Sequence, residues 1–188
     1  MPTKTPKQDS IPVPNIVQKE DPVLRGKAKE VPIADITSKA IKDIIRDMRI
    51  ALASQKDGVA IAAPQIGKSL RIFVVSGELL AKADKTYTGS PTDLIFINPT
   101  IVRRSKEKME VEEGCLSVRW LYGTINRAAR VTLRAYDENG QKIERGASGL
   151  LAQIFQHETD HLEGTLFIDH ADEIWEMTDE EIAELQGK

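Results

Sequence analysis

The sequence predicts an α+β fold in which mainly antiparallel β-sheets surround a buried central helix. Three observations lead to this prediction. Short runs rich in β-branched residues follow one another in the middle of the chain, a turn sequence comes directly after the last run, and a strongly apolar helix follows. Strands in succession before a late helix are typical of α+β proteins with antiparallel sheets.

The first expected element is an amphipathic helix between Ile36 and Gln55. Its apolar residues recur at the spacing of one helical face: Ile41, Ile44, Ile45, Met48 and Leu52. Strands are then expected in the runs RIFVV at 71–75, LIFINPTIV at 94–102 and RVTLRAY at 130–136. Because DENG at 137–140 is a turn sequence, the last strand should form a hairpin with the residues that follow.

Two further helices are expected near the end of the chain. The first begins at Ser148, ends at Gly164 and contains the stretch QHETDH at 156–161. It is apolar on more than one side, so it should be buried in the core. The second begins at Thr178, where TDEE matches a capping box in which Glu181 returns to the Thr178 amide.

Length and composition limit the class of protein. The chain has 188 residues, 40 % hydrophobic and 29 % charged, which predicts one soluble domain without a membrane-spanning run. We expect a flexible extension at 1–14, one domain at 15–170 and an acidic helical tail at 171–188. The polar N-terminus does not resemble a secretory signal, and the lone cysteine, Cys115, fits a reducing compartment, so a cytoplasmic location is expected.

Charge is distributed unevenly along the chain. The net charge is −3, but the segment from Glu158 to the end holds eleven acidic residues and one basic residue, so the remainder is net positive. The basic residues are scattered, which favours an ordinary solvated surface over a stable nucleic-acid site.

The stretch QHETDH indicates a metal site. His157 and His161 are four residues apart, so they project from one helical face with Cβ atoms about 6 Å apart and can reach one ion. Glu158 lies beside them, where a carboxylate can take a proton from a metal-bound water. The pattern also occurs in proteins without metal, but these polar side chains would be costly to bury in an apolar helix without a shared partner.

The motif alone leaves the third ligand open. Phe167 stands where one metalloprotease class has a third histidine, which excludes that class. Glu180, nineteen residues after His161, keeps a metalloendopeptidase as an alternative, although it belongs to an acidic surface helix. His170 lies outside the motif helix. Cys115, in EEGCLSV, would complete a Cys/His/His set with a fourth position open, as in catalytic sites.

Three separated motifs resemble those of the peptide deformylases. They are GVAIAAPQIG at 58–67, similar to the family's G-x-G-L-A-A-P-Q, EGCLS at 113–117 and QHETDHLEGTLFID at 156–169. DPVLRGKAKEV at 21–31 also resembles the family's N-terminal D-P-x-L-R segment, and the resemblance covers about residues 15–169. It implies a peptide-deformylase-like fold, with the central domain as the catalytic domain.

The resemblance implies a metal-dependent hydrolase that removes the formyl group from the N-terminal formylmethionine of newly made proteins and releases formate. Its substrates would be N-formylmethionyl peptides in the bacterial cytoplasm, with an organelle as the other setting. It implies one divalent ion, Fe²⁺ in vivo with Zn²⁺, Ni²⁺ or Co²⁺ as substitutes, held by Cys115, His157 and His161.

The resemblance also implies catalytic, binding and supporting roles. Glu158 would accept and return a proton, while the side-chain amide of Gln65 and the backbone N–H of Leu116 would stabilise the oxyanion. Substrate-binding residues, including an apolar pocket for the methionine, are expected to be Val59, Ala60, Val111, Gly114, Leu150 and Ile154. Glu113 and Arg127 are expected to form an ion pair that braces the metal loop.

The chain departs from the family pattern at several positions. Ala60 replaces the second glycine of the first motif and Ile61 its leucine, so a methyl group lies where the substrate backbone should approach. Gln153 occupies a usually apolar position, and VRWLYG at 118–123 lacks the proline and basic residues common there. A metal- or peptide-binding relative with weak or no turnover because of Ala60 is therefore an alternative. The acidic tail differs from the basic helix by which some members contact the ribosome, so a transient ribosome contact stays unassigned.

Overall fold

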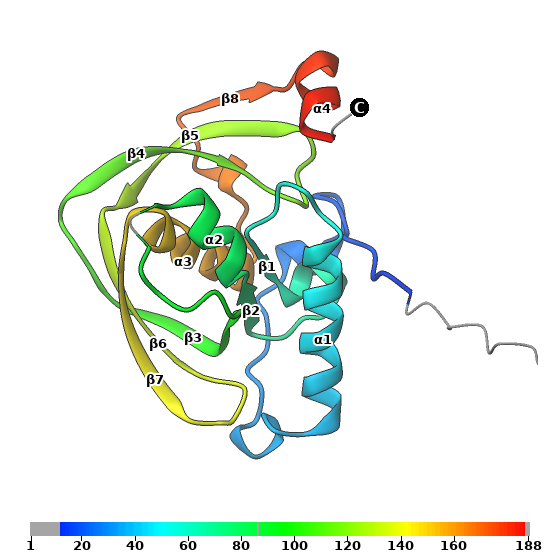
Figure 1. Cartoon of the computed structure of the whole chain (residues 1–188), viewed down its shortest axis with the longest axis vertical. Coiled ribbons are helices and arrows are strands. Elements are labelled where there is room, and N and C mark those ends of the chain that lie inside the picture. The colour runs from blue at the N-terminus through cyan, green and yellow to red at the C-terminus, as the bar shows by residue number, and fades with distance from the viewer. Residues whose placement is uncertain (1–11, 86, 187–188) are drawn as a thin grey trace, which may run out of the picture.

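The computed structural model describes residues 12–85 and 87–186 (Figure 1). In this part of the chain the α-helices are α1 (Lys39–Ala53), α2 (Gly77–Ala83), α3 (Gly149–Leu162) and α4 (Asp179–Gln186). The strands are β1 (Ala60–Ala62), β2 (Ile72–Val75), β3 (Leu94–Arg104), β4 (Lys108–Gly114), β5 (Leu121–Ala128), β6 (Arg130–Tyr136), β7 (Lys142–Ser148) and β8 (Glu173–Glu176). The 3₁₀ helices are η1 (Pro22–Arg25), η2 (Ile33–Asp35), η3 (Ala63–Ile66) and η4 (Phe167–Asp169).

The strands form two antiparallel sheets. One has the order β1-β2-β3-β6-β7, and the other has the order β4-β5-β8. The chain leaves the first sheet between β3 and β4 and returns to it between β5 and β6. The predicted α+β class with antiparallel sheets is thus confirmed.

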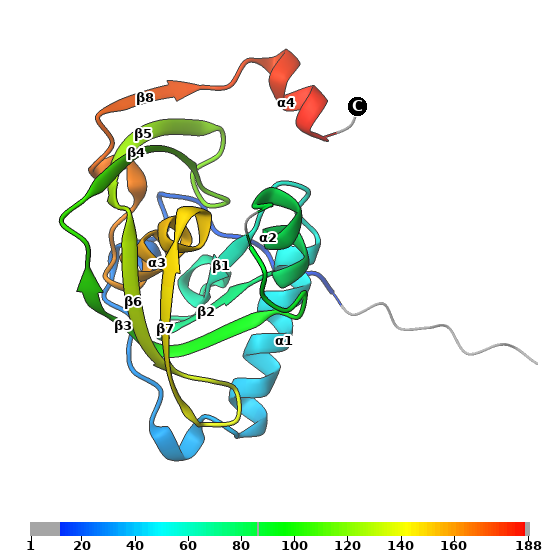
Figure 2. The ribbon, with the colours of Figure 1, turned by 60° about the vertical axis from the view of Figure 1, so that its left-hand side comes forward.

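Helix α3 lies between the two sheets and packs against strands of both (Figures 1 and 2). Phe155 on this helix is fully buried and makes ring contacts with Phe96 of β3, at a centroid distance of 4.9 Å, and with Phe73 of β2, at 6.0 Å. The helix has Ser148 as its N-cap and ends before Gly164, which has φ +79°, as the sequence predicted. The HETDH stretch is therefore held in the interior.

Helix α1 begins later than expected because Ser38 caps it. The Ser38 hydroxyl accepts a hydrogen bond from the Ile41 N–H at 3.3 Å, so the residues from Ile36 to Ser38 lie before the helix. The apolar face of α1 is buried against β1, β2 and η3. One side of the first sheet is covered in this way.

The C-terminal segment differs in part from the helical tail expected at 171–188. Its first part forms β8, which pairs with β5, and only then does α4 follow. The capping box is as predicted, because Glu181 accepts from the Thr178 N–H at 2.8 Å and the Thr178 hydroxyl accepts from the Glu181 N–H at 3.3 Å. Most of the extension expected at 1–14 falls outside the described residues. In the described ranges, no helix has both the length and the apolar character needed to cross a membrane.

Candidate active site

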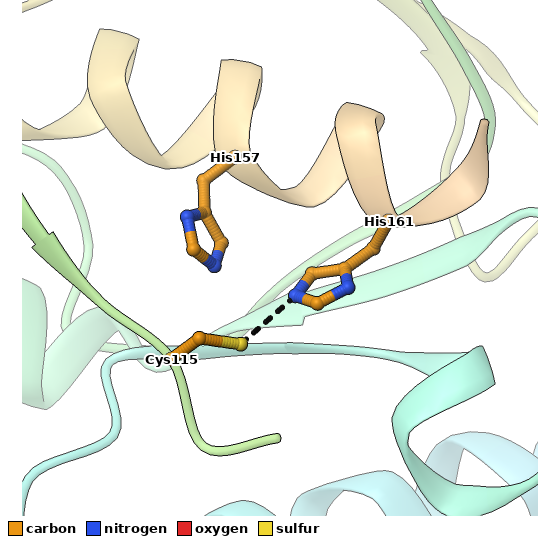
Figure 3. Close-up of side chains that lie close together, drawn as sticks. All are labelled: Cys115, His157 and His161. Carbon is orange, nitrogen blue, oxygen red and sulfur yellow. Dashed lines mark hydrogen bonds between the residues drawn. The ribbon is translucent and has the colours of Figure 1, made fainter. Parts of the chain in front are cut away.

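Cys115 lies next to the two histidines of α3. It directly follows β4, and its Sγ is 3.2 Å from His161 Nε2. The rings of His157 and His161 have centroids 5.0 Å apart, and both point from the helix toward the cysteine (Figure 3). One ligand atom from each of the three residues lies within 4.8 Å of the others. This spacing suits a single ion bound by a Cys/His/His set.

The other ligand candidates lie elsewhere. Glu180 is exposed on α4 and does not join the Cys/His/His group, so the ligand set of the alternative metalloendopeptidase is not formed. His170 is exposed after η4 and is not part of the group either.

A buried ion pair orients His157. Glu113 Oε2 lies 2.8 Å from His157 Nδ1, and both carboxylate oxygens accept from the Arg127 guanidinium, at 2.8 Å and 2.9 Å. Burial alone would raise the pKa of Glu113, but the hydrogen bonds from Arg127 and His157 outweigh it and lower this pKa to about 2. The ionised carboxylate therefore accepts a hydrogen bond from Nδ1–H, which orients the ring so that Nε2 is the atom that can bind an ion. The expected pairing of Glu113 with Arg127 is present.

The electrostatics of the cluster fit a cation. Burial disfavours a charged His157, but its contacts with Cys115 and Glu113 raise its pKa well above the usual value. Burial and the neighbouring His157 lower the pKa of His161 well below its usual value, so His161 is neutral and its lone pair is available. The metal-free cluster thus holds a proton on His157, and an ion bound at this imidazole would displace it.

Glu158 is buried beside the ligands, and no hydrogen bond from the described part of the chain to its Oε2 offsets the cost of burying the carboxylate. Its Oε2 has no hydrogen-bond partner among the described residues, and the same is true of His161 Nδ1. Burial, with help from Glu113 and Asp160 and against the charge of His157, raises the pKa of Glu158 to about 7. A carboxyl group with this pKa can both accept and donate a proton near neutral pH.

Gln65 faces the same cluster from η3. It is 2 % exposed, and its Oε1 accepts from the Ala62 N–H at 2.8 Å. This bond fixes the amide so that Nε2 points toward Cys115 Sγ, at 3.5 Å, and donates to the Ser117 hydroxyl at 3.2 Å. The amide donor is therefore held beside the ligands by a 3₁₀ turn that Pro64 helps to start.

A cavity of about 180 Å³ adjoins the cluster. It is lined by Val59, Ala60, Gly114, Leu150 and Ile154 of the expected binding residues, and also by Gln65, Glu113, Cys115, Leu116, Gln153, His157 and Glu158. Val111 does not line it; this residue lies three positions before Gly114 on β4, opposite Ile125 of β5.

Some residues of the site were not found from the sequence. Asp160 accepts from the second Arg127 terminal nitrogen at 2.6 Å, and it could have been noticed as another acid within the apolar helix. Asp57 and Arg119 form an ion pair at the cavity wall, with the Arg119 guanidinium 4.4 Å from the Trp120 ring centroid. These residues come from two segments far apart in sequence, which no local pattern links.

The chain matches a known protein family over most of its length. The family model described as polypeptide deformylase matches residues 13–176. A peptide deformylase of Pseudothermotoga lettingae is 43 % identical over 150 residues, which are 79 % of this chain and 77 % of that protein. The chloroplastic/mitochondrial peptide deformylase 1A of Arabidopsis thaliana is 39 % identical over 175 residues, 87 % of this chain and 63 % of that relative, so the chain spans less than two thirds of its length.

Solved structures give the same result. A peptide deformylase from Thermotoga maritima has a TM-score of 0.74 and 33 % identity, covering 87 % of this chain and 100 % of that one. A class I type b deformylase from Acinetobacter baumannii, solved with Met-Ala-Ser bound, has a TM-score of 0.75 and 29 % identity, covering 86 % of this chain and 100 % of that one. The chain therefore belongs to the polypeptide deformylase family, the metal-dependent hydrolases that remove the formyl group from an N-terminal methionine.

Proposed function

We propose that this chain releases formate from N-formylmethionyl peptides with one divalent ion held by Cys115, His157 and His161. The observation that carries the proposal is the grouping of three converging ligand atoms with a buried, unpartnered carboxylate at Glu158. With an ion bound, such a set would place a positive charge next to an acid–base group.

The donor set suits several ions. Thiolate and imidazole ligands bind Fe²⁺, Zn²⁺, Ni²⁺ and Co²⁺, and we infer Fe²⁺ as the ion in vivo from the family resemblance. An ion bound here polarises a carbonyl oxygen and lowers the pKa of a coordinated water to about 7. Glu113 and Arg127 hold the His157 ring in the orientation that this binding needs.

Glu158 moves the proton in the proposed reaction. Its carboxylate takes a proton from the attacking water and passes it to the amine nitrogen as the formyl C–N bond breaks. Burial raises the pKa of this carboxyl in the metal-free protein, which favours its acting as both acceptor and donor. Because its Oε2 has no partner among the described residues, no competing bond must break before the proton is accepted.

Two donors would stabilise the negative charge on the formyl oxygen. The Gln65 amide plane is fixed by its bond to Ala62, and its Nε2, which points toward Cys115 Sγ at 3.5 Å, would turn that hydrogen to the formyl oxygen. The Leu116 N–H follows the metal ligand Cys115 directly, and the Leu116 carbonyl accepts from the Gln18 amide at 3.1 Å, which restrains this loop.

The methionine side chain would occupy the cavity beside the ligands. Val59, Leu150 and Ile154 give its wall apolar character, and Gly114, which packs against the Tyr122 ring, also lines it. The bound Met-Ala-Ser of the Acinetobacter baumannii relative supports a peptide of this kind as the ligand. The bacterial and organellar relatives support a setting where formylated chains are made, and contact with the ribosome stays a prediction.

The test is formate release from formyl-Met-Ala-Ser by protein purified without oxygen and loaded with Fe²⁺ or Ni²⁺. We expect turnover by the parent chain and a loss of about a thousandfold in kcat for Glu158→Gln. The glutamine variant keeps the size of the side chain, so its metal content should stay at one ion per chain. Metal analysis of the anaerobically purified protein tests the choice of Fe²⁺.

The matched variant is Cys115→Ser, which should lose the ion as well as the activity. A parent protein that binds one ion tightly but releases no formate would contradict the proposal and favour a binding relative. Equal activity of the parent and Glu158→Gln would contradict the role given to Glu158.

A further inference from the structure

The segment 16–18 contacts both of the residues expected to donate to the oxyanion. The Val17 N–H donates to the backbone carbonyl of Gln65 at 2.9 Å, and the side-chain Nε2 of Gln18 donates to the backbone carbonyl of Leu116 at 3.1 Å. Gln65 belongs to η3, and Leu116 belongs to the loop after β4. We call residues 16–18 the N-terminal strap, because they link these two parts of the site.

Apolar side chains anchor the strap on both sides. Ile16 packs against the cluster of buried residues that contains Ile66 and Leu116. Val17 packs against another cluster, which contains Val118. The backbone of the strap is therefore held by packing, so the Gln18 side chain extends from a fixed position.

Gln18 bridges two backbone groups of the loop after β4. While its Nε2 donates to the Leu116 carbonyl, its Oε1 accepts from the Arg119 N–H at 3.4 Å. Nε2 also lies 3.4 Å from the Ile16 carbonyl, within the strap itself. Because both loop partners are backbone groups, one side-chain amide limits the rotation of the peptide planes between positions 116 and 119.

Gln18 lies outside the active-site cavity. It is not among the residues that line this cavity, whereas Leu116 and Arg119 are. All three residues also line a second cavity, of about 360 Å³. The Gln18 side chain is exposed, and its position falls outside the motifs at 58–67, 113–117 and 156–169. Its effect on a substrate held beside the ligands must therefore pass through the loop.

We propose that Gln18 is a positioning residue that keeps the Leu116 N–H directed at the formyl oxygen. The inference rests on the proposed function and adds to it a residue outside the motifs. Only the φ and ψ rotations of Leu116 separate its N–H from its carbonyl, so holding the carbonyl limits the direction of the N–H. A donor that is already aligned stabilises the transition state without reorganisation as charge develops.

The test replaces Gln18 with leucine, which has a similar size but neither donates nor accepts a hydrogen bond. We expect kcat for formyl-Met-Ala-Ser to fall about tenfold, which is less than the loss of about a hundredfold or more when an oxyanion donor is removed outright. KM should change by less than about twofold, because the uncharged formyl carbonyl gains little from an aligned donor. The affinity for Met-Ala-Ser, which lacks the formyl group, and the metal content should both stay unchanged.

Gln18→Glu separates the two bonds that the amide makes to the loop. Its carboxylate can still accept from the Arg119 N–H but cannot donate to the Leu116 carbonyl. The kcat should therefore fall as far as in Gln18→Leu. A parental kcat in Gln18→Glu would contradict the inference, because the bond to Leu116 would then have no effect on the reaction.

The matched control is Gln141→Leu. Gln141 is exposed in the turn between β6 and β7 and is not among the residues that line the cavity. The same change of side chain at this position should leave kcat, KM and metal content unchanged. The Tm of both leucine variants should stay within about 3 °C of the parent value, because exposed substitutions cost little stability.

Two further results would overturn the inference. One is a kcat of Gln18→Leu equal to that of the parent. The other is a loss of Met-Ala-Ser affinity or of the ion as large as the loss of kcat, which would mean that the strap supports the whole site.

If the parent releases no formate, the proposed function fails, and the restraint on the loop is tested separately in the metal-free protein. Hydrogen exchange of the Leu116 amide, followed by NMR, should be at least about threefold faster in Gln18→Leu than in the parent and in Gln141→Leu. Equal exchange in all three proteins would show that Gln18 does not restrain this donor.

Discussion

Glu113 orients the His157 ring for metal binding through a hydrogen bond to Nδ1. It is 4 % exposed, and an isolated carboxylate at this depth would be costly to ionise. Arg127 gives it two hydrogen bonds and gives a third to Asp160 on α3, so each charge in this group has a partner. A buried pair of this kind contributes little net stability, but it fixes geometry. Its role here is to hold one imidazole in one tautomer and one orientation.

Glu158 makes the metal-free protein less stable above neutral pH. Its folded-state pKa of about 7 exceeds the ordinary value of 4.5. A raised pKa leaves stability intact below 4.5, and stability is lost as pH rises from 4.5 to about 7, because the unfolded chain ionises freely and the buried group does not.

We therefore expect Glu158→Gln to stabilise the chelator-treated protein by about 3 kcal/mol at pH 8 and by less than about 1 kcal/mol at pH 5. Urea unfolding at the two pH values measures this difference. A variant no more stable than the parent at pH 8 would show that Glu158 ionises there without cost.

Ala60 sets the width of the cavity beside β1. Its methyl group lines the cavity, while its backbone pairs with Val75 of β2. We expect Ala60→Gly to lower KM for formyl-Met-Ala-Ser about threefold with little change in kcat, because the substrate backbone can come closer. The variant should also lose about 1 kcal/mol of stability, since glycine weakens a strand. Steady-state kinetics and urea unfolding check the two effects, and an increased KM would show that the methyl group contacts the substrate favourably.

At the scale of elements, an ion pair and hydrogen bonds link the loop after β4 to the loop before β1. Arg119 pairs with Asp57 and donates to the Gln55 side chain at 3.0 Å, and its backbone N–H donates to Gln18 at 3.4 Å. Packing adds to these bonds, because a Cβ at Gly58 would meet Leu116 Cδ1 at 2.8 Å. These contacts fix the distance between the two walls of the cavity, one carrying the Leu116 N–H and the other leading to Ala60.

We expect Asp57→Asn to lower kcat/KM about tenfold and the free energy of unfolding by about 1–2 kcal/mol. The substitution removes the negative charge that pairs with the largely buried Arg119 guanidinium. Asp93→Asn is the control, since Asp93 pairs with Arg49 on α1 at 3.2 Å and lies outside the cavity lining. Its effect on kcat/KM should be negligible. Equal losses in both variants would mean that Asp57 acts only through overall stability.

The elements that sequence patterns predict are those with regular apolar spacing. Helices α1 and α3 and the hairpin β6–β7 have it, and their prediction is confirmed within a few residues. Strand β5 was missed because two of its inward positions hold Gly123 and Arg127, and an arginine faces inward only when a distant Glu113 pairs with it. Strand β8 was missed because all four of its residues are exposed, so no alternation marks it.

At the scale of the whole molecule, the site is formed by residues that are far apart in the sequence. Cys115 comes from the end of a strand in one sheet, whereas His157 and His161 come from the helix between the sheets. Residue patterns predicted the two histidines but left the third ligand open between Cys115 and Glu180. Only the fold, or a resemblance to proteins that share it, shows which of these distant residues meets the helix. For the same reason, no local pattern links Asp57 to Arg119.

An ion that binds all three ligands would link α3 to the second sheet, so its removal should lower the stability of the whole fold. At a free-ion concentration about 1,000 times Kd, binding adds about 4 kcal/mol, which corresponds to a Tm about 10 °C higher for a chain of this size. We expect a chelator to remove this increment from the parent protein and to leave Cys115→Ser unaffected. Thermal unfolding with and without Ni²⁺ measures it.

Hydrogen exchange locates the same effect in the fold. Loss of the ion should expose amides in the loop after β4 and in the second half of α3 first, because these segments carry the ligands. Helix α1 should keep its protection, since the cluster of buried residues that supports it, including Ile45, Met48 and Ile72, draws only Leu116 from the loop after β4. Uniform loss of protection across all elements would contradict this, and would mean that the ion stabilises the fold only as one cooperative unit.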